Sequence, residues 1–311
     1  MAKRESGTVV GLLVLCIGLW IATPYFATAS NIANVVEQSA VVGIVAIGMT
    51  FVILTGGIDL SVGSLVALAG VAMGTALQHH WPLALAIGSG LLAGVVAGAA
   101  NGVMTTVGKL PPFIATLGMM SVARGAALIL ADGRPISGFP ASLRALATRD
   151  VLGVPGPVIF MLVLYAAAHM ILTRTVFGRY VYAIGGNEEA TALSGIDVRL
   201  HKTLVYAISG LSAGVCAVLL VARLNSAQPI AGIGYELDAI AAVVIGGTSL
   251  LGGSGSVVGT LIGALIMSVL RNGLNLLGVS SYVQQVAIGV VIVVAVLVDM
   301  ALHRRVQRTA R

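Results

Sequence analysis

Ten apolar runs follow one another along the chain and leave little room for anything else. They fall at residues 8–26, 32–53, 61–78, 83–107, 113–131, 155–173, 203–222, 237–251, 256–275 and 282–302. Only 9% of the 311 residues are charged and 58% are hydrophobic, whereas a soluble domain of this length needs far more charge. Because about 20 apolar residues cross a bilayer as a helix, the sequence predicts an all-α polytopic membrane protein. We expect about ten transmembrane helices in a single domain, residues 1–311.

The basic residues predict which connections face the cytoplasm. Positive charge gathers on the cytoplasmic side of membrane proteins. When the ten runs are threaded in order, both termini and the segment 174–202 fall on that side, and the loop 132–150 falls outside. The basic residues at the two ends are Lys3, Arg4, Arg304, Arg305, Arg308 and Arg311. The outer loop carries Arg134, Arg144 and Arg149 and is a local exception to this bias.

The first apolar run could also be read as a signal peptide. Ala27-Thr28-Ala29 follows this run and resembles a signal-peptide cleavage site, but a retained first spanning helix is the simpler interpretation.

The net charge of +6 could suggest nucleic-acid binding, yet the basic residues are scattered between apolar runs. A bilayer, rather than nucleic acid, is therefore the expected partner.

Sequence motifs for catalysis and for metal binding are absent. The five histidines lack the spacing of metal ligands. Cys16 and Cys216 lie inside apolar runs, which indicates packing rather than a disulfide or metal framework. The chain also lacks a Gly-x-x-x-x-Gly-Lys-Ser/Thr phosphate loop. We therefore expect neither an enzyme nor a cofactor in this chain, and any ATP that powers it must be bound by another polypeptide.

Two glycine joints connect apolar runs with almost no polar loop. The first joint, Thr55–Ser61, separates the second and third runs, and the second joint, Gly246–Gly253, separates the eighth and ninth. Each contains Gly-Gly followed by a small-residue apolar run. Glycine-broken segments at matching positions in two halves of a chain point to a transport pathway. Tight turns that use glycine are an equally good explanation, and the sequence leaves open whether the joints are re-entrant.

Asp59 is the one carboxylate that could lie deep in the bilayer. A buried acid suggests a functional site, such as a proton or sodium site. The alternative is that Asp59 caps the third run by accepting a backbone N–H bond from Val62 or Gly63. The order Asp-Leu-Ser before a helical run favours the cap.

Uncharged amides are the candidates for a solute pathway. Amide groups pair with hydroxyls without leaving an unpaired counter-charge, so they suit a neutral polar solute. Ordinary hydrogen bonds between helices explain each amide equally well. The candidates are Asn101, Asn272, Asn275 and Gln284.

A second polar group is expected at the outer mouth of the bundle. Its residues would meet a solute or an external docking protein, or belong to a solvated loop. They are Arg223, Gln228 and Glu236. Arg124 falls within the fifth run, and we expect it to turn into the bundle and to be paired.

The segment Gly178–Lys202 holds the largest concentration of charge and carries helix punctuation. Asn187 is a good N-cap, and Glu188 and Glu189 then complement the dipole of the first turn. Gly195 would end the helix. A two-turn helix on the cytoplasmic face, between the sixth and seventh spans, is therefore predicted. Such a helix can pass a rigid-body motion from a partner into the bundle, whereas a solvated loop explains the charge but not the punctuation.

The order of motifs along the chain resembles a known family. The run Glu189-Ala190-Thr191-x3-Gly195 is similar to the EAA signature of ABC-importer permeases, although this chain departs at Thr191 and Val205 and lacks the final Leu-Pro. Further stretches look like the ribose-type (monosaccharide) permease family and cover nearly the whole chain in order. They are residues 48–50, 57–64, 178–180, 185–188, 226–229, 234–238, 246–250 and 272–281.

The resemblance implies a permease subunit of the bacterial inner membrane that works as a homodimer. Its partners would be cytoplasmic ATPase subunits, which bind ATP and Mg, and a periplasmic sugar-binding protein. The implied activity is ATP-driven import of a monosaccharide by alternating access, with ribose favoured among pentoses and hexoses. The segment 179–202 would couple to the ATPase. The predicted coupling residues are Arg179, Asn187, Glu188, Glu189, Ala190, Gly195 and Asp197.

Two other functions stay open at this level. An ion-coupled secondary transporter would need a titratable site at mid-membrane, and Asp59 is its candidate. An ABC permease for another small polar solute, such as a branched-chain amino acid, would share the architecture. A zwitterion would call for charged partners in the pathway, and few are visible in the sequence.

Overall fold

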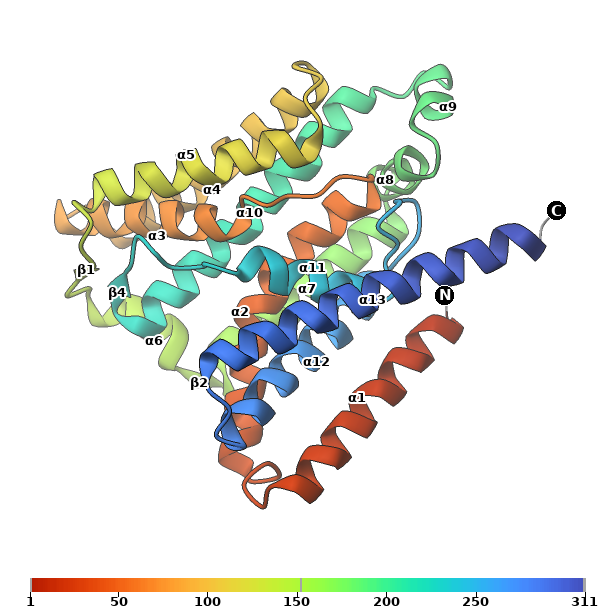
Figure 1. The fold of residues 1–311 in the computed structure, drawn as a ribbon. Coiled ribbons are helices and arrows are strands. Elements are labelled where there is room, and N and C mark those ends of the chain that lie inside the picture. The colour runs from red at the N-terminus through yellow and green to blue at the C-terminus, as the bar shows by residue number, and fades with distance from the viewer. Residues whose placement is uncertain (1, 152, 310–311) are drawn as a thin grey trace.

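The computed structural model describes residues 2–151 and 153–309, which are mostly helical (Figure 1). Arg311 lies outside the described residues, as do the side chains of Lys3, Arg4, Arg304, Arg305 and Arg308. The helices are α1 (Ala2–Ala22), α2 (Ala29–Leu54), α3 (Val62–Gln78), α4 (Leu83–Thr106), α5 (Pro112–Leu130), α6 (Ala141–Thr148), α7 (Gly156–Arg174), α8 (Val176–Gly186), α9 (Glu188–Leu193), α10 (Val198–Leu224), α11 (Tyr235–Ile245), α12 (Val257–Leu276) and α13 (Ser281–Thr309).

Each of the ten apolar runs overlaps one helix, although the eighth run, 237–251, continues past the end of α11 at Ile245. Among the described residues, six helices are long and apolar enough to cross a membrane, namely α2, α4, α5, α7, α10 and α12. Shorter apolar stretches lie in α1, α3 and α13. Helix α11 has 11 residues, which at 1.5 Å per residue is about 16 Å and too short for a bilayer core of about 30 Å. A multi-pass helical membrane protein is confirmed, and the count of ten spans stays a prediction.

The structure adds elements that the sequence analysis treated as loops. Helices α6 and α8 are short and amphipathic, and α8 buries Gly178, Val181 and Ile184 on one face. Their apolar residues are too few to stand out as a run. The expectation of an all-α protein also needs a small correction, because loop backbones pair as two antiparallel ladders. Strands β1 (Ile136–Ser137) and β4 (Ser226–Ala227) form one, and β2 (Asp150–Val151) and β3 (Val154–Pro155) form the other.

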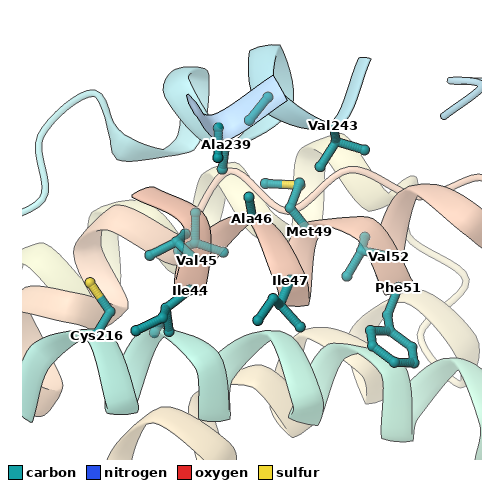
Figure 2. Close-up of a cluster of buried hydrophobic side chains, with 14 of the residues drawn as sticks. Ile44, Val45, Ala46, Ile47, Met49, Phe51, Val52, Cys216, Ala239 and Val243 are labelled. Atoms are coloured by element: carbon teal, nitrogen blue, oxygen red, sulfur yellow. The ribbon is translucent and has the colours of Figure 1, made fainter. Parts of the chain in front are cut away.

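Helices α2 and α10 run through the core of the bundle. Buried side chains of α2, including Ile44 and Met49, pack against Cys216 of α10 and Val243 of α11 (Figure 2). Helix α4 lies directly against α10, since a side chain at Gly210 would overlap the backbone of α4. Small residues allow such close helix contacts in lipid. Cys216 is a buried, free cysteine, as its place in an apolar run predicts.

The ends of several helices gather on one side of the molecule. Helix α1 begins and α13 ends on the side where α8 and α9 lie, whereas α6, β1 and β4 lie at the opposite end (Figure 1). The chain leaves α2 beside α8 and runs back along the bundle to the start of α3 (Figure 1). The polar segments that could carry function are therefore held at defined places by the long helices.

Candidate functional site

The short helix predicted after Gly178 is present as α9, six residues long. The Asn187 side chain accepts a hydrogen bond of 2.9 Å from the N–H of Ala190, which is the expected N-cap. Gly195 follows the helix with a φ of +84°, a conformation that favours glycine. Asp197 then caps α10 by accepting a bond of 3.0 Å from the N–H of Leu200. These caps place α9 between two helices with a fixed turn at each end.

The outer surface of α9 combines charge with an exposed apolar side chain. Glu189 and Ala190 are exposed, and Leu193 is 84% exposed. Thr191 is buried and anchors the inner side of the helix. Single exposed apolar side chains are common on protein surfaces, so Leu193 alone does not mark a partner contact. Sequence analysis did not predict its exposure, because a leucine in a short helix gives no sign of which side it faces.

A cleft of about 630 Å³ lies between α9 and the end of α4. Charged side chains from both sides line it, including Lys109, Glu189 and Arg199. Lys202 of α10 and Glu188 of α9 form an ion pair of 2.9 Å at the same cleft. Glu188 is half exposed in this pair, so the pair contributes little stability. The pair links α9 to the second turn of α10.

Helix α8 is tied to α10 by aromatic side chains. The ring of Phe177 stacks on His201 with centroids 5.8 Å apart, and Tyr180 meets the same imidazole edge-on at 5.0 Å. The Tyr182 hydroxyl donates a bond of 2.9 Å to the carbonyl of Gly255, and burial raises the pKa of this phenol. Arg179 is exposed on the same helix. Helices α8 and α9 and the first turns of α10 thus form one packed block, named the cytoplasmic-side block for the side on which the sequence predicts it to lie.

Asp59 is fully buried in the first joint, but it does not cap α3 as predicted. Its Oδ1 accepts bonds of 2.9 Å from the N–H and 2.6 Å from the hydroxyl of Ser61. Its Oδ2 accepts a bond of 2.8 Å from Ser209 of α10, and Asn101 of α4 donates 2.8 Å to Ser61 Oγ. Ser61 takes the N-cap position, so the carboxylate turns back onto Ser61 and across to α10 instead of reaching Val62 or Gly63.

The four amides proposed for the solute pathway lie in two places. Asn101 belongs to the Asp59 cluster, while the others are near the end of α12. Asn272 exchanges bonds of 2.8 and 3.0 Å with Asn31 of α2. Gln284 of α13 donates to Asn275 Oδ1 at 2.7 Å and to the carbonyl of Val279 at 2.8 Å. Each of these amides makes at least one hydrogen bond within the protein, although the buried Oδ1 of Asn101 has no partner in the described part of the chain. Their pathway role stays a prediction.

The outer-mouth residues lie around the loop between α10 and α11. Arg223 pairs with Glu37 of α2 at 3.2 Å. Glu236 accepts a bond of 3.3 Å from the N–H of Gly234, and Gln228 is half-buried. Their docking role stays a prediction.

Arg124 turns into the bundle and is paired, as predicted. Its Nη1 donates 2.9 Å to the carbonyl of Pro229 and 2.7 Å to that of Ala231. The sequence analysis missed a second paired arginine, the exposed Arg271 of α12, which binds the buried Asp238 of α11 at 2.7 Å. Arg271 and Asp238 lie within or beside apolar runs, and no sequence motif indicates that their side chains meet.

The two glycine joints contact one another. The N–H of Gly253 donates a bond of 2.9 Å to the carbonyl of Leu54, which is the last residue of α2. The chain from Gly246 to Ser256 is non-helical. The first joint also leads into α3 at Gly63, and the backbone of Gly232 packs directly onto Gly63. Whether either joint is re-entrant in a membrane stays a prediction.

Comparison with known proteins identifies the family. The model of a family described as branched-chain amino acid transport system permease components matches residues 31–296. The ribose import permease of Escherichia coli K12 is 49% identical over 95% of this chain and 93% of its own length. The chain belongs to the ribose-type ABC permease family. The ribose import permease of Bacillus subtilis is 48% identical over 95% of this chain and 92% of its own length.

More distant members of the ribose-type family transport other sugars according to their names. The xylose transport permease of E. coli K12 is 36% identical over 92% of this chain and 88% of its own length. No solved structure matches the chain significantly. These relatives are permease proteins, so they support the prediction of a transport subunit in the inner membrane rather than an enzyme.

Proposed function

We propose that this chain is the membrane-spanning permease of an ATP-driven importer for a monosaccharide, with ribose as the first candidate. The observation that carries the proposal is the identity of nearly half of all aligned positions with ribose import permeases across almost the whole chain. The chain would form one permease domain over its full length. The branched-chain description of the broader family is less specific than these relatives.

The importer would need partners that supply energy and specificity. A second copy of the permease would complete the translocation path between two bundles. Cytoplasmic ATPase subunits would bind ATP and Mg, and a periplasmic binding protein would deliver the sugar. The permease then needs little affinity of its own for the sugar, which agrees with an interior where Asn272 and Gln284 already bond to protein groups.

The cytoplasmic-side block supports a coupling role for α9. Its exposed residues, Glu189 and Leu193, offer a charged and an apolar contact. Helix α10 starts directly after α9 and runs through the core, so a push on α9 is carried into the bundle. Closure of the ATPase subunits on ATP would move this block and open the bundle outward to receive sugar. This is alternating access driven from one face.

We also propose that both termini are cytoplasmic and that the ten apolar helices all enter the bilayer. This proposal is supported by Figure 1, in which the start of α1, the end of α13 and the helix α9 lie on the same side of the molecule. Helix α11 would be a half-helix, and the non-helical chain on either side of it would complete the crossing. Single cysteines placed at the exposed positions 7 and 190 should both be labelled by a membrane-impermeant thiol reagent from the cytoplasmic side. Labelling of either one from the outside would contradict this topology.

Sugar identity is tested by uptake. The permease would be expressed with its ATPase and binding protein in cells that lack their own ribose importer. We expect uptake of labelled ribose that excess unlabelled ribose blocks and that excess xylose or a branched-chain amino acid does not. If only xylose, or only the amino acid, blocks this uptake, that competitor would replace ribose as the proposed substrate.

The coupling site is tested by co-purification of the tagged permease with its ATPase subunit. We compare the wild type with Glu189→Lys, and we use Arg144→Glu on exposed α6 as a charge-reversal control at the opposite end. We expect the ATPase to be lost from Glu189→Lys only, with the permease still folded. A wild type that retains no ATPase would contradict the coupling proposal.

A further inference from the structure

Helix α8 touches the end of α2, where the first glycine joint begins, and the second glycine joint through its backbone. At Gly185 the approach is so close that a Cβ would overlap the carbonyl oxygen of Leu54 and the amide nitrogen of Gly253. A Cβ at Gly252 would likewise lie 2.9 Å from the carbonyl of Gly185 and 2.9 Å from the N–H of Gly56. One glycine of α8 therefore lies where the end of α2 and the second joint meet.

The Tyr182 side chain makes another contact between α8 and the chain of the second glycine joint. It precedes Gly185 by three residues, so the two lie on the same face of α8. Its hydroxyl donates 2.9 Å to the carbonyl of Gly255, next to the start of α12. The joint is thus held at Gly252–Gly253 by close packing and at Gly255 by a hydrogen bond.

The cytoplasmic-side block can move only if these contacts move with it or break. Helices α8 and α9 are separated by the single residue Asn187, and the rings of Phe177 and Tyr180 hold α8 to His201 of α10. A motion imposed on α9 is therefore shared by α8. Non-helical segments at helix ends absorb most of the backbone change in hinge motions, and both joints are such segments.

We propose that Gly185 and Tyr182 are positioning residues that pass the motion of the ATPase-side helices to the two glycine joints. The close contact at Gly185 transmits to the end of α2 and hence to α3, and the Tyr182 bond transmits to α12. Both joints are then driven together from α8, in addition to the direct path from α9 into α10. The inference rests on the proposed function, because it assigns a role within the same coupling motion.

The test measures coupling rather than activity alone. The complete importer (permease, ATPase and binding protein) is reconstituted in proteoliposomes, and sugar uptake and ATP hydrolysis are measured on the same preparation. The variants are Tyr182→Phe, which removes one hydroxyl and keeps the ring, and Gly185→Ala. The matched control is Gly186→Ala, whose added Cβ meets nothing within 4 Å.

We expect Tyr182→Phe to assemble normally, with the number of sugar molecules moved per ATP hydrolysed falling at least threefold. Gly185→Ala should lower this ratio at least tenfold, while Gly186→Ala keeps it. An unchanged ratio in Tyr182→Phe overturns the inference, whether or not Gly185→Ala assembles. A parallel loss of uptake and hydrolysis, with the number of sugar molecules moved per ATP preserved, also overturns it. That outcome would mean that less protein is active while its coupling is intact. If the wild type shows no ATP-driven uptake, the proposed function itself fails, which this design detects separately.

Discussion

Ser209 of α10 donates a hydrogen bond of 2.8 Å to Asp59, which precedes it by 150 residues. The bond connects the first glycine joint to the helix that continues from α9. With Ser61 supplying two further donors, the buried carboxylate accepts three hydrogen bonds. A carboxylate satisfied in this way is part of the helix framework, and an ion would have to displace these donors to bind it.

We expect Asp59→Asn to destabilise the protein without changing its energy source. The Asn oxygen can keep both bonds from Ser61, but its NH₂ group then faces Ser209, whose hydroxyl must turn to accept a bond. Replacing bonds to a charged group, worth about 1.5–3 kcal/mol each, with neutral bonds of about 0.5–1.5 kcal/mol should lower the free energy of unfolding by about 1 kcal/mol. Thermal unfolding in lipid nanodiscs would measure the loss, with Asp132→Asn on an exposed loop as the control.

The same Asp59→Asn variant separates the two modes of transport. Its remaining uptake should stay dependent on ATP and insensitive to a protonophore or to removal of sodium. Two results together would instead support an ion-coupled transporter. Wild-type uptake would collapse with the proton or sodium gradient, and Asp59→Asn would abolish uptake.

Loss of the cap on α9 should weaken binding of the ATPase. Asn187→Ala removes the acceptor for the N–H of Ala190, and N-cap removal costs about 1 kcal/mol. If binding requires α9 to be helical, affinity should fall roughly fivefold. Titration of the ATPase subunit onto permease in nanodiscs would measure it. Asn187→Asp keeps the acceptor oxygen and should bind like the wild type, and equal weakening in both variants would show that the cap is not the cause.

Arg124 should stabilise the loop that leads into α11. Arg124→Met leaves the carbonyls of Pro229 and Ala231 without the guanidinium donor. Unsatisfied buried carbonyls cost about 1–3 kcal/mol. We expect a lower unfolding temperature and faster proteolysis at residues 225–234, with Arg144→Met on exposed α6 behaving like the wild type. Equal protection of the loop in Arg124→Met would mean that other contacts hold it.

The Asn31–Asn272 pair should couple α2 and α12. Interhelical hydrogen bonds in membranes average about 0.6 kcal/mol and reach about 1.7 kcal/mol, and this pair makes two. A double-mutant cycle with Asn31→Ala and Asn272→Ala should give a coupling energy near the upper value, measured by unfolding in nanodiscs. Strictly additive effects would show that the bonds contribute no net stability. If folded Asn272→Ala loses uptake while Asn31→Ala keeps it, the pathway role of Asn272 gains support.

The sequence alone determined which segments become helices and how some of them begin and end. Apolar runs predict ten of the helices, because a helix that lies in lipid or in the protein core needs apolar residues along its whole length. The cap of α9 was predictable because Asn187 and its partner Ala190 are three residues apart. Motifs in order along the chain were enough to indicate the family, which the relatives confirm. All of these are local or linear properties.

Only the tertiary structure decided which polar groups and joints meet. Asp59 was expected to bind its own helix, yet Ser209 and the Asn101–Ser61 bond surround it from α10 and α4. Arg124 finds carbonyls more than 100 residues away, and α8, read from the sequence as loop, contacts the end of α2 and the second glycine joint at Gly185. The physical reason is the same in each case. A buried polar group or a bare backbone surface must find a partner, and packing of distant helices, rather than neighbouring sequence, determines which partner is within reach.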